Sequence, residues 1–159
     1  MDRASYRGWM DALKPFVIAI DHVGVAVPDL DEAIAFYRDT LGLELTHDEV
    51  NEAQGTHEAM MRAPGDDGTG AAVQLLAPLA PDSTIGKFLA RKGPGLQQLA
   101  YRVTDIEAAM EALRAKGVRV LYEKPANGTS NSRVNFVHPK DAGGVLIELV
   151  EPAQGEPKH

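Results

Sequence analysis

The sequence predicts an α+β fold made of two tandem modules, each a strand, a helix and three further strands. Two internal repeats support this prediction. Residues 20–31 match residues 96–107 at an offset of 76, and residues 73–78 match residues 147–152 at an offset of 74. Because related strands open and close each half, duplication of one module accounts for both matches.

Each half opens with a strand that runs into an amphipathic helix. Apolar side chains spaced three and four residues apart form one stripe per helix: Leu30, Ile34, Tyr37 and Leu41 in the first, and Ile106, Met110 and Leu113 in the second. Such a stripe has the period of a helix with one buried face. We therefore expect each helix to bury one side.

Polar residues mark where these helices begin and end. The helix starts carry pairs with capping-box spacing, Asp29 with Glu32 and Thr104 with Glu107. Such a pair satisfies backbone N–H groups that lack partners in the first turn. Gly42 and Gly117 follow the helices, where glycine most easily takes a left-handed conformation.

Shorter strands fill the rest of each half. They are expected at residues 43–47 and 56–62 in the first half, and at residues 118–123 and 133–138 in the second. Asn127-Gly128 is a turn signal between the last two strands. Residues 63–70 are rich in Gly, Asp and Pro and predict a loop.

The length of 159 residues favours one domain. We expect an N-terminal extension over residues 1–16 and a single domain over residues 17–152, followed by a tail over residues 153–159. Within the domain, the modules span about 17–80 and 94–152.

Composition excludes several kinds of site and partner. No apolar run approaches the roughly 20 residues that cross a bilayer, so we expect a cytoplasmic protein. The absence of cysteine excludes thiolate nucleophiles, disulfides and zinc-thiolate sites. A formal net charge of -7 argues against nucleic acid or an anionic membrane surface as partner. A small anionic ligand would need a local cluster of cations.

Four polar residues occupy repeat-equivalent positions in the predicted strands. Gln74 and Glu148 lie between apolar neighbours, and His22 and Gln98 lie near the starts of the other two strands. In a duplicated fold with approximate two-fold symmetry, these positions converge on one central cleft. An imidazole, two amide oxygens and a carboxylate are competent ligands for a divalent ion. Such an ion would also offset the cost of burying Glu148 unpaired.

Short motifs run through both halves. They are DHVGVA at 21–26, EAQG at 52–55, DST at 82–84, KFL at 87–89, HPK at 138–140 and GGVLIEL at 143–149. With these motifs, residues 19–152 resemble the vicinal oxygen chelate superfamily of paired βαβββ modules and, within it, the methylmalonyl-CoA epimerase family. The resemblance implies a curved mixed β-sheet with a cleft, and a metal-dependent epimerase that interconverts (2R)- and (2S)-methylmalonyl-CoA by 1,1-proton transfer.

The resemblance also implies roles for individual residues. The family's metal ligands fall on the four positions that the repeat selects: His22, Gln74, Gln98 and Glu148. Its acid-base pair falls on Glu58 and Glu148. Family members often carry His-His where this chain has Gln97-Gln98. The implied cofactor is one divalent ion, cobalt first, with manganese, nickel, zinc or magnesium as alternatives. The implied assembly is a homodimer.

Inversion at a carbon needs an acid-base group on each face, because a base that returns its own proton to the same face changes nothing. Alternation along the strand puts Glu58 on the face of Met60 and sends His57 to the other side. The anionic coenzyme A portion needs donors outside the cleft. The candidates are Ser83, Thr84, Lys87, Arg91, Arg133 and Lys140. Helix capping is an equally good account of Ser83 and Thr84.

Two other functions stay open. The first is another enzyme of the superfamily, such as a glyoxalase-type isomerase or a ring-cleaving dioxygenase. The dioxygenase would want two histidines and a carboxylate, and the glyoxalase pattern would prefer a carboxylate where Gln74 stands. The second is a metal-free module that binds or sequesters a small molecule, which has no use for Glu58 or for Glu148 in an apolar strand.

Overall fold

The structure, a computed structural model, describes residues 11–154. These residues divide into two compact units, one formed by residues 21–97 and the other by residues 11–20 together with 98–154. The expected 1–16 extension and 153–159 tail fall largely outside the described residues. No helix within residues 11–154 is long and apolar enough to cross a membrane.

The unit of residues 21–97 holds the first module. Its elements are β1 (Val17–Ala26), α2 (Leu30–Asp39), β2 (Glu44–Asn51), β3 (Thr56–Arg62), β4 (Ala72–Pro78) and α3 (Thr84–Lys92). The second part of β1 belongs to this unit. The strand order is β2-β3-β4-β1, with β1 parallel to β4 and the other pairs antiparallel. The predicted strand, helix and three strands are therefore confirmed here.

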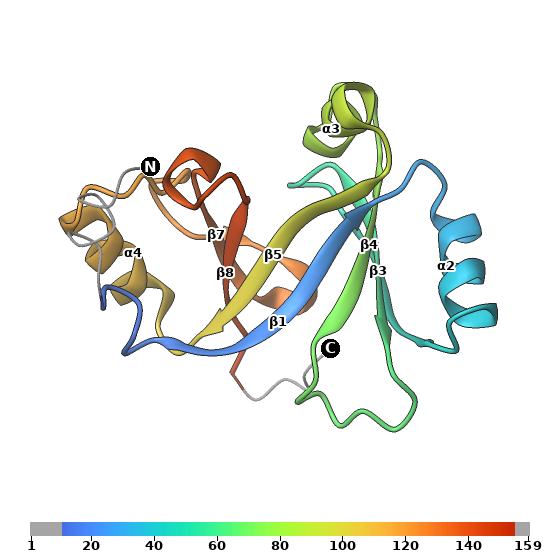
Figure 1. Cartoon of the computed structure of the whole chain (residues 1–159), viewed down its shortest axis with the longest axis horizontal. Coiled ribbons are helices and arrows are strands. Elements are labelled where there is room, and N and C mark those ends of the chain that lie inside the picture. Colours follow the sequence, from blue (N-terminus) through green and yellow to red (C-terminus); the bar gives the residue numbers. More distant parts are fainter. Residues whose placement is uncertain (1–10, 155–159) are drawn as a thin grey trace. The chain divides into compact units, whose positions relative to one another are not determined.

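The two helices of this unit pack on opposite faces of its sheet. The α2 stripe packs Leu30 and Ile34 against Ala59, Met61 and Leu75, and α2 lies beside β3 and β4 in Figure 1. Alternation then sends the residues between them to the other face. That second face is covered in part by α3, whose Ile85 packs on Ala26 and Leu76.

Gly86 lets α3 come close to the chain that precedes it. A Cβ built on Gly86 would lie 2.5 Å from the carbonyl oxygen of Pro81 and 2.6 Å from that of Ala80. Because any side chain would collide with rigid backbone, this turn of α3 requires glycine.

The other unit holds the second module. Its elements are β5 (Gly95–Val103), α4 (Ile106–Ala115), β6 (Ala126–Asn127), the 3-10 turn η1 (Thr129–Asn131), β7 (Arg133–Val137), a second 3-10 turn η2 (Pro139–Asp141) and β8 (Ile147–Glu151). The strand order is β5-β8-β7-β6, with β5 parallel to β8. The α4 stripe packs Ile106, Met110 and Leu113 against Leu149 and Val137.

The strand register confirms the duplication. Gln74 pairs with Gly24 and Met60, whereas Glu148 pairs with Ala100 and Phe136. Gly24 and Ala100 are themselves separated by the repeat offset. Gln74 and Glu148 thus hold the same place in two equivalent ladders.

The helix ends follow the predicted pattern with one correction. Asp29 caps α2 by accepting a hydrogen bond from the Glu32 N–H at 3.0 Å. The predicted cap at Thr104 is wrong, because the Asp105 carboxylate accepts from the Ala108 N–H at 3.0 Å. Both residues can cap a helix, and the first turn begins one residue later than the spacing suggested. Gly42 and Gly117 have positive φ, as expected.

The strand predicted at residues 118–123 is wrong. This segment makes only an isolated bridge between Val120 and Val137, and the short strand β6 follows it. The buried Asn135 side chain replaces the ladder: its Oδ1 accepts from Tyr122 N–H at 3.0 Å and its Nδ2 donates to Tyr122 C=O at 2.9 Å. A side-chain amide that pairs both backbone groups of Tyr122 removes the need for a strand partner there.

Candidate active site

Three of the predicted site residues lie in the first module, each on a different strand. His22 comes from β1, Glu58 from β3 and Gln74 from β4. Met60 lies opposite Gln74 in the β3–β4 ladder, so Glu58, two residues away, shares the face of Gln74. This is the face opposite α2, and all three side chains are buried in it. We call His22, Glu58 and Gln74 the first-module cluster.

Glu58 is a buried carboxylate, 4% exposed, held by two neighbours. The Thr56 hydroxyl donates to its Oε1 at 2.7 Å, and the Gln74 amide nitrogen donates to its Oε2 at 3.4 Å. Because burying an ionised carboxylate is costly without hydrogen bonds, these two donors stabilise it. Its neighbour His57 lies on the other face and contacts Asp48.

His22 is buried beside another carboxylate. Its Nδ1 lies 2.8 Å from Oδ2 of Asp21, and both side chains are almost completely covered. The strand pattern did not predict that Asp21 contacts His22, because strand neighbours normally point to opposite faces.

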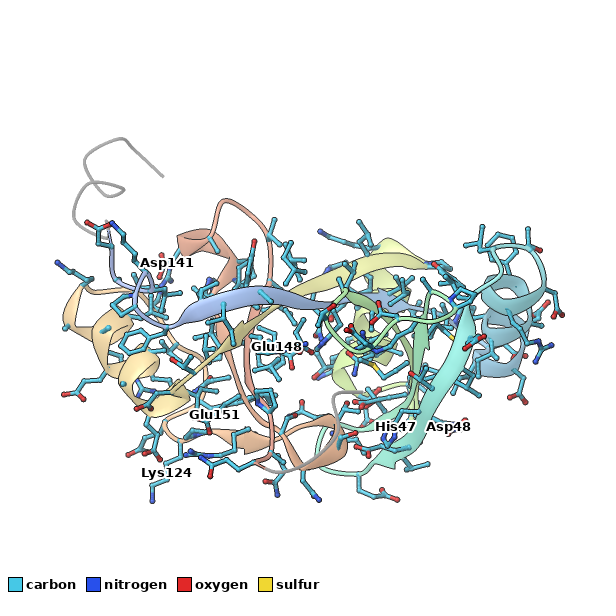
Figure 2. All side chains as sticks on the ribbon, turned by 90° about the horizontal axis from the view of Figure 1, so that it is seen from below. His47, Asp48, Lys124, Asp141, Glu148 and Glu151 are labelled. Carbon is cyan, nitrogen blue, oxygen red and sulfur yellow. The ribbon has the colours of Figure 1, made fainter. Side chains whose placement is uncertain are left out.

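The second module contributes Gln98 and Glu148, from β5 and β8. The Gln98 amide nitrogen donates a hydrogen bond to Oε2 of Glu148. Glu148, labelled in Figure 2, is 6% exposed. We call these two residues the second-module cluster.

The donor chemistry of the two clusters fits a divalent ion. In each cluster the NH2 group of a glutamine donates to a carboxylate, Gln74 to Glu58 and Gln98 to Glu148. That orientation presents the amide oxygen, the atom able to coordinate a cation, on the other side of the group. Residues 11–154 contain no group of three or more His, Asp or Glu side chains arranged to hold a metal. An ion bound here would therefore need amide oxygens among its ligands.

Two candidate substrate-binding residues lie at the start of α3. Ser83 is its N-cap: the hydroxyl accepts from the Gly86 N–H at 3.1 Å and donates to the Ala80 carbonyl at 2.7 Å. Capping is therefore a role that the Ser83 hydroxyl performs in this structure. Thr84 is exposed at the first position of the helix, and Lys87 and Arg91 are exposed further along it.

The two remaining candidates lie in the second module. Arg133 donates to Glu107 at 2.5 Å and to Glu151 at 3.2 Å, and the hydrogen bond that it donates to Glu107 raises the pKa of the Arg133 guanidinium. Both carboxylates compete with any anionic ligand for Arg133. Lys140 is exposed on η2.

Arg62 is a further residue that the sequence analysis did not select. It shares strand parity with Glu58 and Met60, so it lies on the same face, and it is 4% exposed. Its Nη1 donates to the Gly70 carbonyl at 2.8 Å, whereas its Nε and Nη2 have no hydrogen-bond partner within the described part of the chain. The signal that could have identified Arg62 is its spacing: it lies an even number of residues from Glu58 on the same strand, so both side chains point to the same face.

The family of the chain follows from comparison with known proteins. Residues 21–136 match the model of the glyoxalase/bleomycin resistance protein/dioxygenase superfamily. The match covers well over half of the chain, and the two βαβββ modules agree with it. The chain belongs to this superfamily.

Relatives narrow the assignment. An ethylmalonyl-CoA/methylmalonyl-CoA epimerase of Cereibacter sphaeroides is 38% identical over 133 residues, which cover 82% of this chain and 95% of that protein. The crystal structure of methylmalonyl-CoA epimerase from Mycobacterium tuberculosis is 57% identical, with a TM-score of 0.81 and coverage of 86% of this chain and 89% of that one. A methylmalonyl-CoA epimerase in complex with methylmalonyl-CoA and NH4+ is 46% identical, with a TM-score of 0.82 and coverage of 89% and 99%. Within the superfamily, the chain belongs with the methylmalonyl-CoA epimerases.

Proposed function

We propose that this chain is a metal-dependent epimerase that interconverts (2R)- and (2S)-methylmalonyl-CoA by 1,1-proton transfer. The observation that carries the proposal is the buried Glu58 carboxylate, held by Thr56 and Gln74 on the face that also holds His22. A buried carboxylate is expensive to keep for stability alone, because well-packed apolar residues stabilise a sheet face better. The names of the relatives supply the substrate.

The reaction removes the C2 proton, which is acidified by the neighbouring thioester and carboxylate, and returns a proton to the opposite face. Glu58 is the proposed acid-base group on one face of the intermediate enolate, and Glu148 is the group on the other. Positioned acid-base groups of this kind accelerate proton transfer by about 10²- to 10⁴-fold each. Thr56 and Gln74 fix the Glu58 carboxylate so that it meets C2 in one orientation.

The proposed metal ligands are His22, Gln74, Gln98 and Glu148. These residues would hold one divalent ion, for which we expect cobalt first and manganese, nickel, zinc or magnesium as alternatives. Once bound, the ion would supply Lewis-acid stabilisation of negative charge. Glu148 would then serve both as ligand and as acid-base group. Glu58 stays outside the proposed ligand set.

The coenzyme A portion is proposed to bind exposed cations. Lys87 and Arg91 lie on α3, which covers part of the face that carries Glu58. They suit a flexible anionic ligand better than Arg133, which is paired with two carboxylates. The expected homodimer and cytoplasmic location stay predictions.

A metal-free binding module is the competing proposal, and an exchange experiment separates the two. Each epimer of methylmalonyl-CoA is added in deuterated water, with and without divalent ion, and C2 is followed by proton NMR. Interconversion with loss of the C2 proton only when metal is present supports the epimerase. Tight binding without exchange would support the sequestering module.

A variant pair sharpens the assignment of Glu58. Glu58→Gln should slow interconversion by about 10²- to 10⁴-fold, while the second base still exchanges the C2 proton of one epimer. Asp48→Asn is the matched control, because it removes a carboxylate from the opposite face, where Asp48 contacts His57. Unchanged interconversion in Glu58→Gln would remove this residue from the mechanism.

A further inference from the structure

We propose that Asp21 is a positioning residue that fixes the tautomer of His22. In this arrangement Nδ1 of His22 carries the proton and Nε2 holds the lone pair that binds the cation. The last step rests on the proposed function, whereas the tautomer itself concerns the protein without metal.

The hydrogen-bond chemistry of the pair leaves one assignment. Asp21 Oδ2 lies 2.8 Å from His22 Nδ1. An ionised carboxylate has no proton to donate, so the ring nitrogen must be the donor in this contact. A neutral imidazole has one N–H, which is then on Nδ1. Nε2 is the acceptor nitrogen, the one competent to ligate a metal.

Burial along β1 changes phase at this contact. Side chains of successive strand residues normally point to opposite faces. In β1 the alternation of covered and exposed residues shifts at Asp21 and His22, which are both 2% exposed. Both members of the pair are therefore covered, and their side chains lie within hydrogen-bond distance of each other.

Burial makes the contact directional and strong. Water competes poorly for a carboxylate covered as fully as Asp21, so breaking the contact would cost a buried hydrogen bond that solvent cannot easily replace. Two other imidazole–carboxylate contacts, His47 with Glu49 and His57 with Asp48, are much more exposed. Solvent can replace their partners, and their geometry carries no comparable constraint.

The two proposed glutamine ligands are also oriented by carboxylates. Glu58 orients the Gln74 amide, and Glu148 orients the Gln98 amide. In each case a carboxylate accepts from one end of the group and leaves the other end as the donor atom for a cation. Metal-binding histidines use such partners to fix ring orientation and to raise ligand basicity.

The test measures tautomer and metal affinity separately. Long-range ¹H–¹⁵N spectra of the metal-free protein, recorded where imidazole is neutral, report which ring nitrogen is protonated, and His22→Gln identifies the His22 signals. We expect the Nδ1–H form in the wild type and a shift towards the Nε2–H form in Asp21→Ala. Affinity for Co²⁺, measured by chelator competition, should fall by about 10- to 100-fold in Asp21→Ala.

Two variants keep the test decisive. Asp21→Asn retains an acceptor oxygen, so it should keep the tautomer and lose less affinity than Asp21→Ala. It also serves if Asp21→Ala does not fold. Asp48→Asn, which breaks the exposed His57 contact, should change neither quantity for His22.

The outcomes separate this inference from the proposed function. An unchanged tautomer and unchanged Co²⁺ affinity in folded Asp21→Ala would overturn the inference, as would a wild-type His22 protonated on both nitrogens. If Asp21→Ala does not fold, unchanged Co²⁺ affinity in Asp21→Asn would overturn it. Retained metal-dependent epimerisation in those variants would leave the proposed function intact. If His22→Gln binds Co²⁺ as well as the wild type does, His22 is no ligand, and both the proposed ligand set and the last step of the inference fail.

Discussion

The two modules share a register but differ in where they place their carboxylates. Gln74 and Glu148 are equivalent, since Met60 and Phe136 stand opposite them in the same ladder position. Two residues further along each ladder, Glu58 pairs with Leu76 in the first module, whereas Val134 pairs with Val150 in the second.

This difference separates features that the duplication repeats from features found in one module alone. The repeated ladders provide matching positions for two of the proposed metal ligands, Gln74 and Glu148. The proposed acid-base groups, Glu58 and Glu148, occupy positions that are not equivalent, one on β3 and one on β8.

The largest effect is expected at Glu58, whose equivalent in the second module is Val134. Glu58→Gln should lower the rate of interconversion by about 10²- to 10⁴-fold, the usual contribution of an acid-base group. Its Co²⁺ affinity should change little, because Glu58 is not a proposed ligand. Polarimetric or coupled assays measure the rate, and chelator competition measures the affinity. A parallel loss of both would make Glu58 a ligand and weaken the comparison.

The equivalent ligand position should behave differently. Glu148→Gln removes the proposed anionic ligand and should lose both interconversion and metal affinity, the affinity by at least about 10-fold. It makes the second module resemble the first, where Gln74 stands. Full metal affinity in this variant would show that Glu148 acts only as a base.

The modules also differ in the segment that follows the first helix. In the first module β2 pairs with β3 along a ladder, whereas in the second the Asn135 amide takes over the pairing of Tyr122. Asn135 is fully buried, so Asn135→Ala should lower the free energy of unfolding by about 2 to 4 kcal/mol. Urea denaturation measures the change. A loss below about 0.5 kcal/mol would mean that water replaces the amide.

The smallest effect concerns the ion pair next to that segment. Arg119 donates from its side chain and its backbone N–H to Asp141, and these hydrogen bonds hold the pKa of Asp141 well below its ordinary value. A lowered folded-state pKa means that the pair stabilises the fold above about pH 4 and that this stability is lost as the pH falls. The melting temperature of the wild type should exceed that of Asp141→Asn at pH 7, and the difference should shrink below about pH 4. A constant difference would exclude ionisation of Asp141 as its source.

Much of the fold could be predicted from the sequence because duplication repeats its signals. The offsets of 76 and 74 between matching segments are the offsets that the ladders realise through Gly24 with Gln74 and Ala100 with Glu148. The helix start at Asp105 and the missing strand at 118–123 could not be predicted in the same way. Both depend on which side chain reaches a particular backbone group, and spacing alone does not determine that.

The candidate site also contains residues that could be predicted from the sequence and residues that could not. Alternation placed Glu58 on the face of Met60, and the register agrees. Asp21 could not be selected, because regular alternation sends it away from His22 and only the phase change in β1 brings the two together. The burial of Arg62 could not be predicted from the sequence, because a cationic side chain on a strand is more often exposed.

The absence of a Cβ at Gly86 determines how closely α3 approaches the chain that precedes it. At Gly86 the helix rests on the carbonyl oxygens of Ala80 and Pro81, and Lys87 is the next residue along the chain. Any larger side chain at 86 would push the helix outward, and the ammonium group of Lys87 would move with it. If Lys87 binds the anionic coenzyme A portion as proposed, the position of its charge is set by a neighbouring residue that carries no charge.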